Sequence, residues 1–157
     1  MSASDGATQS LNTFIKSFNR RDKDGILSNL HFPLYTHSDG AEPVIIENTD
    51  DFWRGSSLQV EEMRRHEDWA STTLDYSKAL DATENTAHIR AEISRRNTNG
   101  EAYGVARGIW IYAKIEKVYG GNKALVSCDD GRERLMEWRR KFSGRNKRDN
   151  FIAEGCI

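Results

Sequence analysis

The apolar residues of this 157-residue chain change their spacing near Trp69, and that change limits which folds the chain can adopt. From Leu11 to Phe18 they fall at i, i+3, i+4 and i+7, which places them on one face of a helix. From Ala87 to Ile93 they alternate with polar residues, which is the pattern of a strand with one buried face. Helices followed by strands predict one α+β domain, and the chain is long enough to bury one core.

The first two helices are expected close to the N-terminus. Ser10 is the predicted N-cap of the first helix, so residues 1–9, which are small and polar, are predicted to form a disordered tail. A second, short helix is expected from Ile26 to Leu30. It should end before Pro33, because a proline disfavours helical geometry in the residue that precedes it.

A β-hairpin and a third helix are predicted next. The segments Phe32 to Ser38 and Val44 to Ile46 flank a turn and are expected to pair with each other. Thr49 is the predicted cap of a helical turn that reaches Trp53, and the third helix is expected from about Leu58 to Trp69.

The remainder of the domain is predicted to be four long strands in meander order. Asn97 to Gly100 has the chemistry of a hairpin turn, and a long strand is expected from Ala102 to Val118. Two glycines within that strand predict bulging or strong curvature. A turn at Gly120 to Asn122 leads to a last strand, Ala124 to Cys128, antiparallel to the long one. A sheet curved in this way can close around an internal pocket.

Composition and charge exclude several classes of protein. The formal net charge of −1 gives no overall field that would attract nucleic acid or an anionic membrane, and no apolar run reaches the roughly 20 residues of a spanning helix. The two cysteines, Cys128 and Cys156, fit no disulfide framework and no zinc or redox motif. The expectation is a reduced, cytoplasmic protein with no membrane partner.

Residues 131–157 differ in composition from the rest of the chain. Basic residues dominate them, while Leu135, Trp138 and Phe142 share one helical stripe, so a C-terminal helix is expected from Arg132 to Phe142. Such a helix could bind phosphate backbones, or it could be a solvated helix whose stripe packs on a partner. Nucleic acid is not the expected partner.

The element order resembles the nuclear transport factor 2-like (NTF2-like) superfamily, specifically its SnoaL-like and ketosteroid isomerase-like branch. The resemblance covers about Ser10 to Asp129. The segments that carry it are Leu30 to Pro33, Val44 to Phe52, Gly108 to Lys114 and Ala124 to Cys128.

The resemblance implies a cone-shaped, cystatin-like α+β fold, in which a curved antiparallel sheet packs on three N-terminal helices. It implies an NTF2-like domain at 10–130, followed by the basic extension at 131–157. It also implies a homodimer that forms through the sheet. The superfamily includes ketosteroid isomerase, scytalone dehydratase, limonene epoxide hydrolase and polyketide cyclases, as well as members with no known activity, so the fold alone does not assign a reaction.

The candidate catalytic residues are His37 and Tyr35 on the first hairpin. In the alignment that the resemblance implies, His37 stands where isomerase-like members have a catalytic carboxylate, and a histidine can act as general acid or base near neutral pH. Tyr35, Tyr103, Tyr112 or Arg107 could donate a hydrogen bond to a developing oxyanion if they point inward. The alternative is that His37 faces solvent at the end of a strand. His31 is interpreted as a hydrogen-bonded structural residue.

The candidate pocket residues are mostly large and apolar. Strand alternation places Val105, Arg107 and Ile109 on one face of the long strand, with Trp110 and Tyr112 on the other, but does not decide which face lines the pocket. The predicted lining is Phe14, Phe18, Phe32, Phe52, Trp53, Met63, Trp69, Arg107 and Trp110.

No metal or cofactor is expected, because the histidines lack ligand spacing and no glycine-rich phosphate loop is present. Three functions stay open at this point. The first is the binding of a small apolar ligand, without an assignable activity. The second is a cofactor-free isomerase, dehydratase or cyclase that acts on a small ketone or polyketide-like substrate. The third is a protein-interaction module that works through the basic C-terminal helix.

Overall fold

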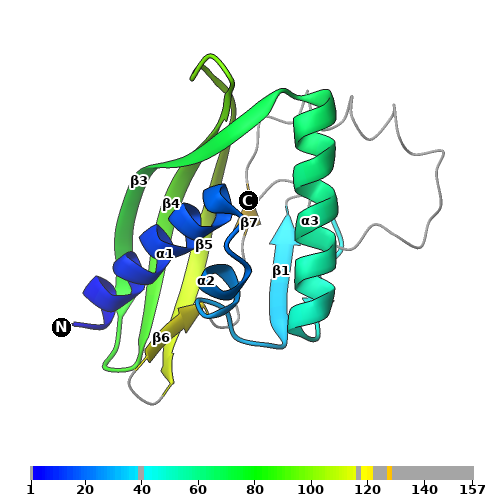
Figure 1. The fold of residues 1–157 in the computed structure, drawn as a ribbon. Coiled ribbons are helices and arrows are strands. Elements are labelled where there is room, and N and C mark those ends of the chain that lie inside the picture. The colour runs from blue at the N-terminus through cyan, green and yellow to red at the C-terminus, as the bar shows by residue number, and fades with distance from the viewer. Residues whose placement is uncertain (1, 39–40, 116–117, 122–126, 129–157) are drawn as a thin grey trace.

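The computed structural model describes residues 2–38, 41–115, 118–121 and 127–128 (Figure 1). Three helices come first, apart from the early hairpin, and an antiparallel sheet follows them. A four-stranded sheet has the order β3-β4-β5-β6, and a three-stranded one has the order β2-β1-β7. Helix α1 lies across the four-stranded sheet, and α3 runs beside β1 (Figure 1). The predicted α+β class is therefore confirmed, although the sheet does not close on itself.

Helix α1 spans Ala3–Arg20 and begins eight residues before the predicted start. Ser2 is its N-cap: the Ser2 side chain accepts a hydrogen bond from the Asp5 backbone N–H, and Asp5 accepts one from the Ser2 backbone N–H. Ala3 and Ala7 are buried in the core. The predicted disordered tail is therefore wrong for residues 2–9, because small residues can form the packed face of a helix as well as a loop.

Helix α3 spans Thr49–His66 without interruption and is capped by Asn48, whose side chain accepts from the Asp51 backbone N–H. The predicted cap at Thr49 and the predicted break before Leu58 are both wrong. The buried face of the helix contains the small polar Ser56 between large apolar residues, which hides the helical period in the sequence.

The remaining early elements are present as predicted, but the second helix has different bounds. Helix α2 spans Lys23–Leu27 with Asp22 as its N-cap, so it begins and ends three residues before the predicted range of Ile26 to Leu30. Strands β1, Leu34–Ser38, and β2, Val44–Ile46, pair in antiparallel fashion, so the predicted hairpin is confirmed.

The four-stranded sheet consists of β3, Trp69–Ala82, β4, Thr86–Asn97, β5, Ala102–Ile115, and β6, Val118–Gly121. Adjacent strands are antiparallel, as predicted for a meander. The prediction is wrong about which segment follows β5 in the sheet.

The segment that pairs with β5 is β6, and it contains Gly120 and Gly121 of the predicted turn. Strand β7, Ser127–Cys128, instead pairs in parallel with β1. The predicted antiparallel pairing with the long strand is therefore wrong. The sequence shows that this segment has a strand pattern, but it does not show which neighbouring strand it pairs with.

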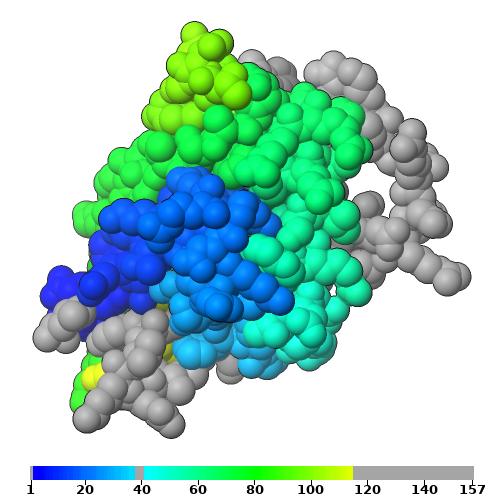
Figure 2. All heavy atoms as spheres, viewed as in Figure 1, coloured from blue at the N-terminus to red at the C-terminus, as the bar shows by residue number. Residues whose placement is uncertain are grey.

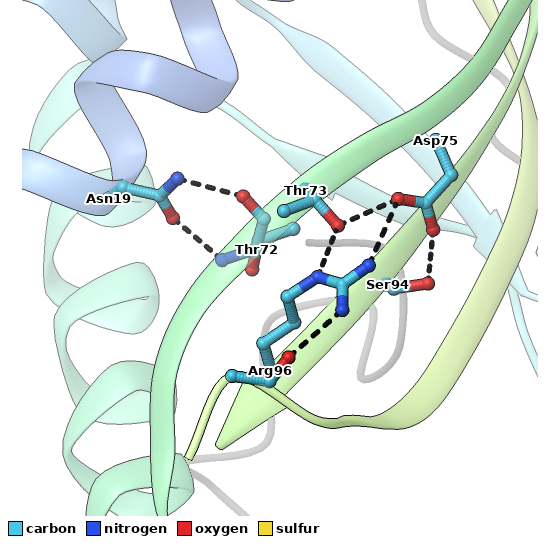
Figure 3. Close-up of polar contacts among 7 residues, drawn as sticks. Asn19, Thr72, Thr73, Asp75, Ser94 and Arg96 are labelled. Carbon is cyan, nitrogen blue, oxygen red and sulfur yellow. Dashed lines mark hydrogen bonds and ion pairs between the residues drawn. The ribbon is translucent and has the colours of Figure 1, made fainter. Parts of the chain in front are cut away.

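Side-chain hydrogen bonds join α1 to the sheet (Figure 3). The Asn19 side chain donates a hydrogen bond of 2.8 Å to the Thr72 carbonyl oxygen and accepts one of 2.8 Å from the Thr72 backbone N–H. On the neighbouring strand, Ser94 donates to Asp75, and Arg96 donates to the Thr73 hydroxyl at 3.0 Å. These contacts fix the end of α1 against β3, and β3 against β4.

Candidate functional site

Most of the predicted pocket residues meet in one aromatic core between α1, α3 and the sheet. The ring of Phe14 lies 5.5 Å from that of Trp110, and the ring of Phe18 lies 5.8 Å from that of Trp69. These four residues, together with Phe52 and Met63, are at most 5% exposed. The residues predicted to line a pocket therefore lie in the core, and their aromatic rings fill much of it; their contact with a ligand stays a prediction.

Two further predicted pocket residues lie at the margin of the core. Phe32 and Trp53 are half-buried, and both pack against the buried cluster. The ring of Phe32 lies 6.1 Å from that of Phe52, so this contact joins the segment before β1 to helix α3.

Arg107 does not belong to the core, and its assignment to the pocket is wrong. Its Nε donates a hydrogen bond of 2.6 Å to Glu92, its cross-strand partner, and half of its side chain is exposed. Trp110 and Tyr112 occupy the buried face of β5, whereas Val105 and Ile109 are exposed on the same face as Arg107. A charged side chain stays on the hydrated face because burial would remove its hydration.

The outward face of the sheet is where the predicted homodimer would form. Tyr76, Leu80, Val105 and Ile109 are all exposed large apolar side chains of β3 and β5. The homodimer stays a prediction. The predicted C-terminal helix lies outside the described residues, as do the proposals that depend on it.

His37 and Tyr35 lie on the face of β1 opposite its buried residues. Leu34 and Thr36 are 4% and 8% exposed, whereas Tyr35 and His37 are half-buried. Successive side chains of a strand point to opposite faces, so Thr36 faces the core together with Leu34. The role of His37 as a base stays a prediction.

Three polar atoms are buried within these same elements and have no hydrogen-bond partner among the described residues. They are His31 Nε2 in the segment before β1, Thr36 Oγ1 on β1 and Gln59 Oε1 on α3. Gln59 lies seven residues after Phe52, and hence on the same face of the helix. Buried polar groups are normally hydrogen-bonded, so three unpaired ones in segments that pack on one another require an explanation.

His31 differs from an ordinary surface histidine in its protonation. Partial burial disfavours the charged imidazolium and lowers the pKa of His31 below its ordinary value of 6.5. The neutral ring has one nitrogen that donates and one that accepts. Because Nε2 has no hydrogen-bond partner among the described residues, the interpretation of His31 as a hydrogen-bonded structural residue does not hold for this atom.

Each of these three groups can form a hydrogen bond with a polar group of a ligand. Gln59 Oε1 only accepts a hydrogen bond, the Thr36 hydroxyl can donate or accept, and a neutral His31 can do either at Nε2 according to its tautomer. A ligand hydroxyl or carbonyl meets these requirements, while the surrounding aromatic rings suit an apolar body.

Sequence reasoning did not identify Thr36 or Gln59 as candidates. The signal for Thr36 was its position between Tyr35 and His37: once Leu34 is assigned to the buried face, alternation places Thr36 there as well. Gln59 could be found only after α3 was known to be one continuous helix.

The described part of the chain contains neither a cluster of metal-binding side chains nor a membrane-spanning helix. Within residues 2–38, 41–115, 118–121 and 127–128, no three histidine, cysteine or carboxylate side chains gather as metal ligands would. In the same ranges, no helix has the length and apolar character needed to span a membrane.

Comparison with known proteins identifies the fold. No family model and no curated protein matches the sequence. A cystatin-like protein of unknown function from Nostoc punctiforme matches with a TM-score of 0.63 at 10% identity, covering 79% of this chain and 89% of its own. A ketosteroid isomerase-like protein from Erwinia carotovora atroseptica matches with a TM-score of 0.58 at 10% identity, covering 79% and 94%. An NTF2-like protein from Cytophaga hutchinsonii matches with a TM-score of 0.59 at 11% identity, covering 82% and 98%.

The class is therefore that of α+β domains in which N-terminal helices pack on a curved antiparallel sheet. The chain has the NTF2-like, or cystatin-like, fold, so the resemblance seen in the sequence is confirmed at the level of the fold.

Proposed function

We propose that the protein binds a small ligand inside the domain, with an apolar body against the aromatic core and one or two polar groups toward His31, Thr36 and Gln59. The observation that carries this proposal is the presence of three buried, unpaired polar atoms in segments that pack on one another. Replacing these atoms by apolar ones would stabilise the core. Their presence at a cost in stability supports a role in binding a ligand.

The ligand class follows from the charges in the described interior. No carboxylate or lysine is among the buried residues of the described chain, and His31 favours its neutral form. The expected ligand is consequently uncharged: a ketone, a phenol or a hydroxylated aromatic compound. An ionised ligand would lose its hydration without gaining a charged partner.

The test is a binding screen of such compounds by the thermal stabilisation of the full chain. A ligand that binds only the folded state raises the midpoint of unfolding. Thr36→Val removes one hydroxyl and Gln59→Leu removes one side-chain amide, and we expect either to weaken binding roughly tenfold.

The matched control is Gln9→Leu on the exposed side of α1. It removes the same amide from the surface and should leave the dissociation constant unchanged. If Thr36→Val and Gln59→Leu both bind the selected ligand as tightly as the wild type, the proposed site is wrong.

A second candidate function is acid–base catalysis without a cofactor on such a ligand, acting as an isomerase, dehydratase or cyclase. The lowered pKa of His31 favours it, because a neutral imidazole is able to accept a proton near neutral pH. His31→Gln and His37→Gln separate the two histidines: loss of turnover only in the first supports His31 as the base, and loss only in the second supports His37. Unchanged turnover in both variants contradicts catalysis by either histidine.

A further inference from the structure

Arg21 occupies an unusual position at the end of α1. It is the left-handed C-cap of that helix, with φ of 56°, a conformation that few residues other than glycine adopt. Its guanidinium carbon lies 5.3 Å from the ring centre of Phe18 and 4.7 Å from that of Trp53. The guanidinium also donates hydrogen bonds to the hydroxyls of Ser56, at 3.4 Å, and Ser57, at 3.1 Å. The side chain is thereby held rigidly between α1 and α3.

Two more cations lie over aromatic rings next to Arg21. Lys23 Nζ lies 5.7 Å from the ring centre of Trp53, and the guanidinium carbon of Arg64 lies 5.4 Å from that of Trp69. The rings of Phe18 and Trp69 are themselves 5.8 Å apart, so the contacts form one continuous chain. We call it the basic–aromatic cluster, and it consists of Phe18, Arg21, Lys23, Trp53, Arg64 and Trp69.

The cluster lies where three helices meet at the surface. Arg21 and Lys23 come from the end of α1 and the start of α2, and the remaining cation comes from α3. Figure 2 shows the face on which the surfaces of α1, α2 and α3 adjoin. Lys23 and Arg64 are exposed, so a solute can reach them.

The three positive charges lack carboxylate partners in the described part of the chain. None of Arg21, Lys23 and Arg64 lies within 4.0 Å of a carboxylate oxygen there, whereas Arg54 and Arg65 on the same helix as Arg64 each have one. Arg21 is also partly desolvated. Its pKa is lowered by burial first and by the charge of Arg64 second, and the charge of Glu61 only partly offsets this.

The guanidinium of Arg21 has hydrogen-bonding capacity left. Of its five N–H groups, the contacts with Ser56 and Ser57 use two, which leaves three. A rigid guanidinium with unused donors, flanked by two further cations, is typical of oxyanion recognition.

We propose that the basic–aromatic cluster binds the phosphate group of a small phosphate ester. A phosphate monoester carries close to two negative charges and several acceptor oxygens, which suits three cations better than a single carboxylate does. The planar donors of Arg21 fix the orientation of the phosphate, while Lys23 and Arg64 contribute charge. This site shares the rings of Phe18, Trp53 and Trp69 with the aromatic core, but it uses none of the polar residues of the proposed interior site.

The test is a titration of the full chain with phenyl phosphate and with inorganic phosphate at constant ionic strength, followed by tryptophan fluorescence. Two of the four tryptophans, Trp53 and Trp69, belong to the cluster, so binding should change the signal. We expect saturable binding of both probes, with an affinity that falls as salt is raised.

Variants then separate this site from nonspecific charge. Lys23→Gln and Arg64→Gln should each weaken phosphate binding roughly fivefold. The matched control Arg54→Gln removes an exposed arginine of the same helix that is already paired with Asp51 at 2.8 Å, and should leave binding unchanged.

Arg21→Lys keeps the charge but loses the planar donors, so it should also weaken binding in a protein that remains folded. Circular dichroism of each variant checks the fold. The proposal is overturned if millimolar phosphate gives no saturable response, or if Arg54→Gln weakens binding as much as Arg64→Gln does. Thr36→Val should not affect this titration, so failure of the interior site and failure of the phosphate site give different results.

Discussion

Replacing Thr36 by valine should stabilise the protein, and replacing Thr72 by valine should destabilise it. Both threonines lie on strands and are buried, with 8% and 1% of their surface exposed. They differ in their hydroxyls. Thr36 Oγ1 has no partner in the described part of the chain, whereas Thr72 Oγ1 accepts a hydrogen bond of 3.1 Å from the indole N–H of Trp69.

The size of each effect follows from these contacts. Burying a hydroxyl without a hydrogen bond costs about 1–3 kcal/mol in proteins, and valine has nearly the same shape without that cost. We therefore expect Thr36→Val to raise the free energy of unfolding by about 1–2 kcal/mol. Thr72→Val removes a hydrogen bond and leaves the buried Trp69 N–H unpaired, so it should lower that free energy by about 1–3 kcal/mol.

The assay is urea unfolding of the wild type and both variants, followed by circular dichroism, with the thermal midpoint as a second measure. For a domain of this length, 1 kcal/mol corresponds to roughly 2–4 °C in the midpoint. If Thr36→Val is destabilised to the same extent as Thr72→Val, the Thr36 hydroxyl is hydrogen-bonded and the reasoning behind the interior site fails. A gain in stability together with a loss of ligand binding is the result that we expect, since sites are commonly retained at some expense in stability.

Three further predictions concern the core and its margin. His31→Gln should reduce the loss of stability between pH 7 and pH 5. The folded-state pKa of His31 lies below the ordinary 6.5, so the unfolded chain binds the proton more readily, and wild-type stability falls as the pH falls below 6.5. Urea unfolding at both pH values measures this effect, and equal losses in the wild type and the variant would contradict it. Asn19→Ala should lower the free energy of unfolding by about 1–3 kcal/mol, because it removes both bonds to the Thr72 backbone; an unchanged midpoint in urea would show that water replaces them. Phe14→Ala should lower it by about 3–5 kcal/mol, because the ring is buried against Trp110; a loss below 1 kcal/mol would indicate that the core refills the space.

The elements of this fold were predictable wherever one periodicity persisted over several residues. The first hairpin and the strand that contains Ala87 to Ile93 have such patterns, and the structure confirms them. The start of α1 was missed because Ala3 and Ala7 have little hydrophobic contrast, although both are buried. The partner of β7 was missed because strand pairing depends on long-range packing.

The candidate site was less predictable than the fold. Burial of aromatic residues follows from their size and apolar character, so the residues of the core could be identified in advance. Strand alternation correctly separated Arg107 from Trp110, but alternation does not decide which face of a strand is buried, so Arg107 was included in the pocket although it lies on the exposed face. The unpaired atoms of His31, Thr36 and Gln59 have no sequence pattern at all, because an unpaired atom is defined by its neighbours in space.

The hydrogen bonds between Asn19 and Thr72 also bear on how copies of this protein avoid aggregation. Strand β3 is an outer strand of the four-stranded sheet, and the exposed backbone of an outer strand can template the addition of another chain. Asn19 occupies both the N–H and the C=O of Thr72, and so it stands where an incoming strand would make its bonds. Removing this one amide would free both backbone groups of Thr72 on the outer strand, and we expect such variants to associate edge to edge more readily during refolding.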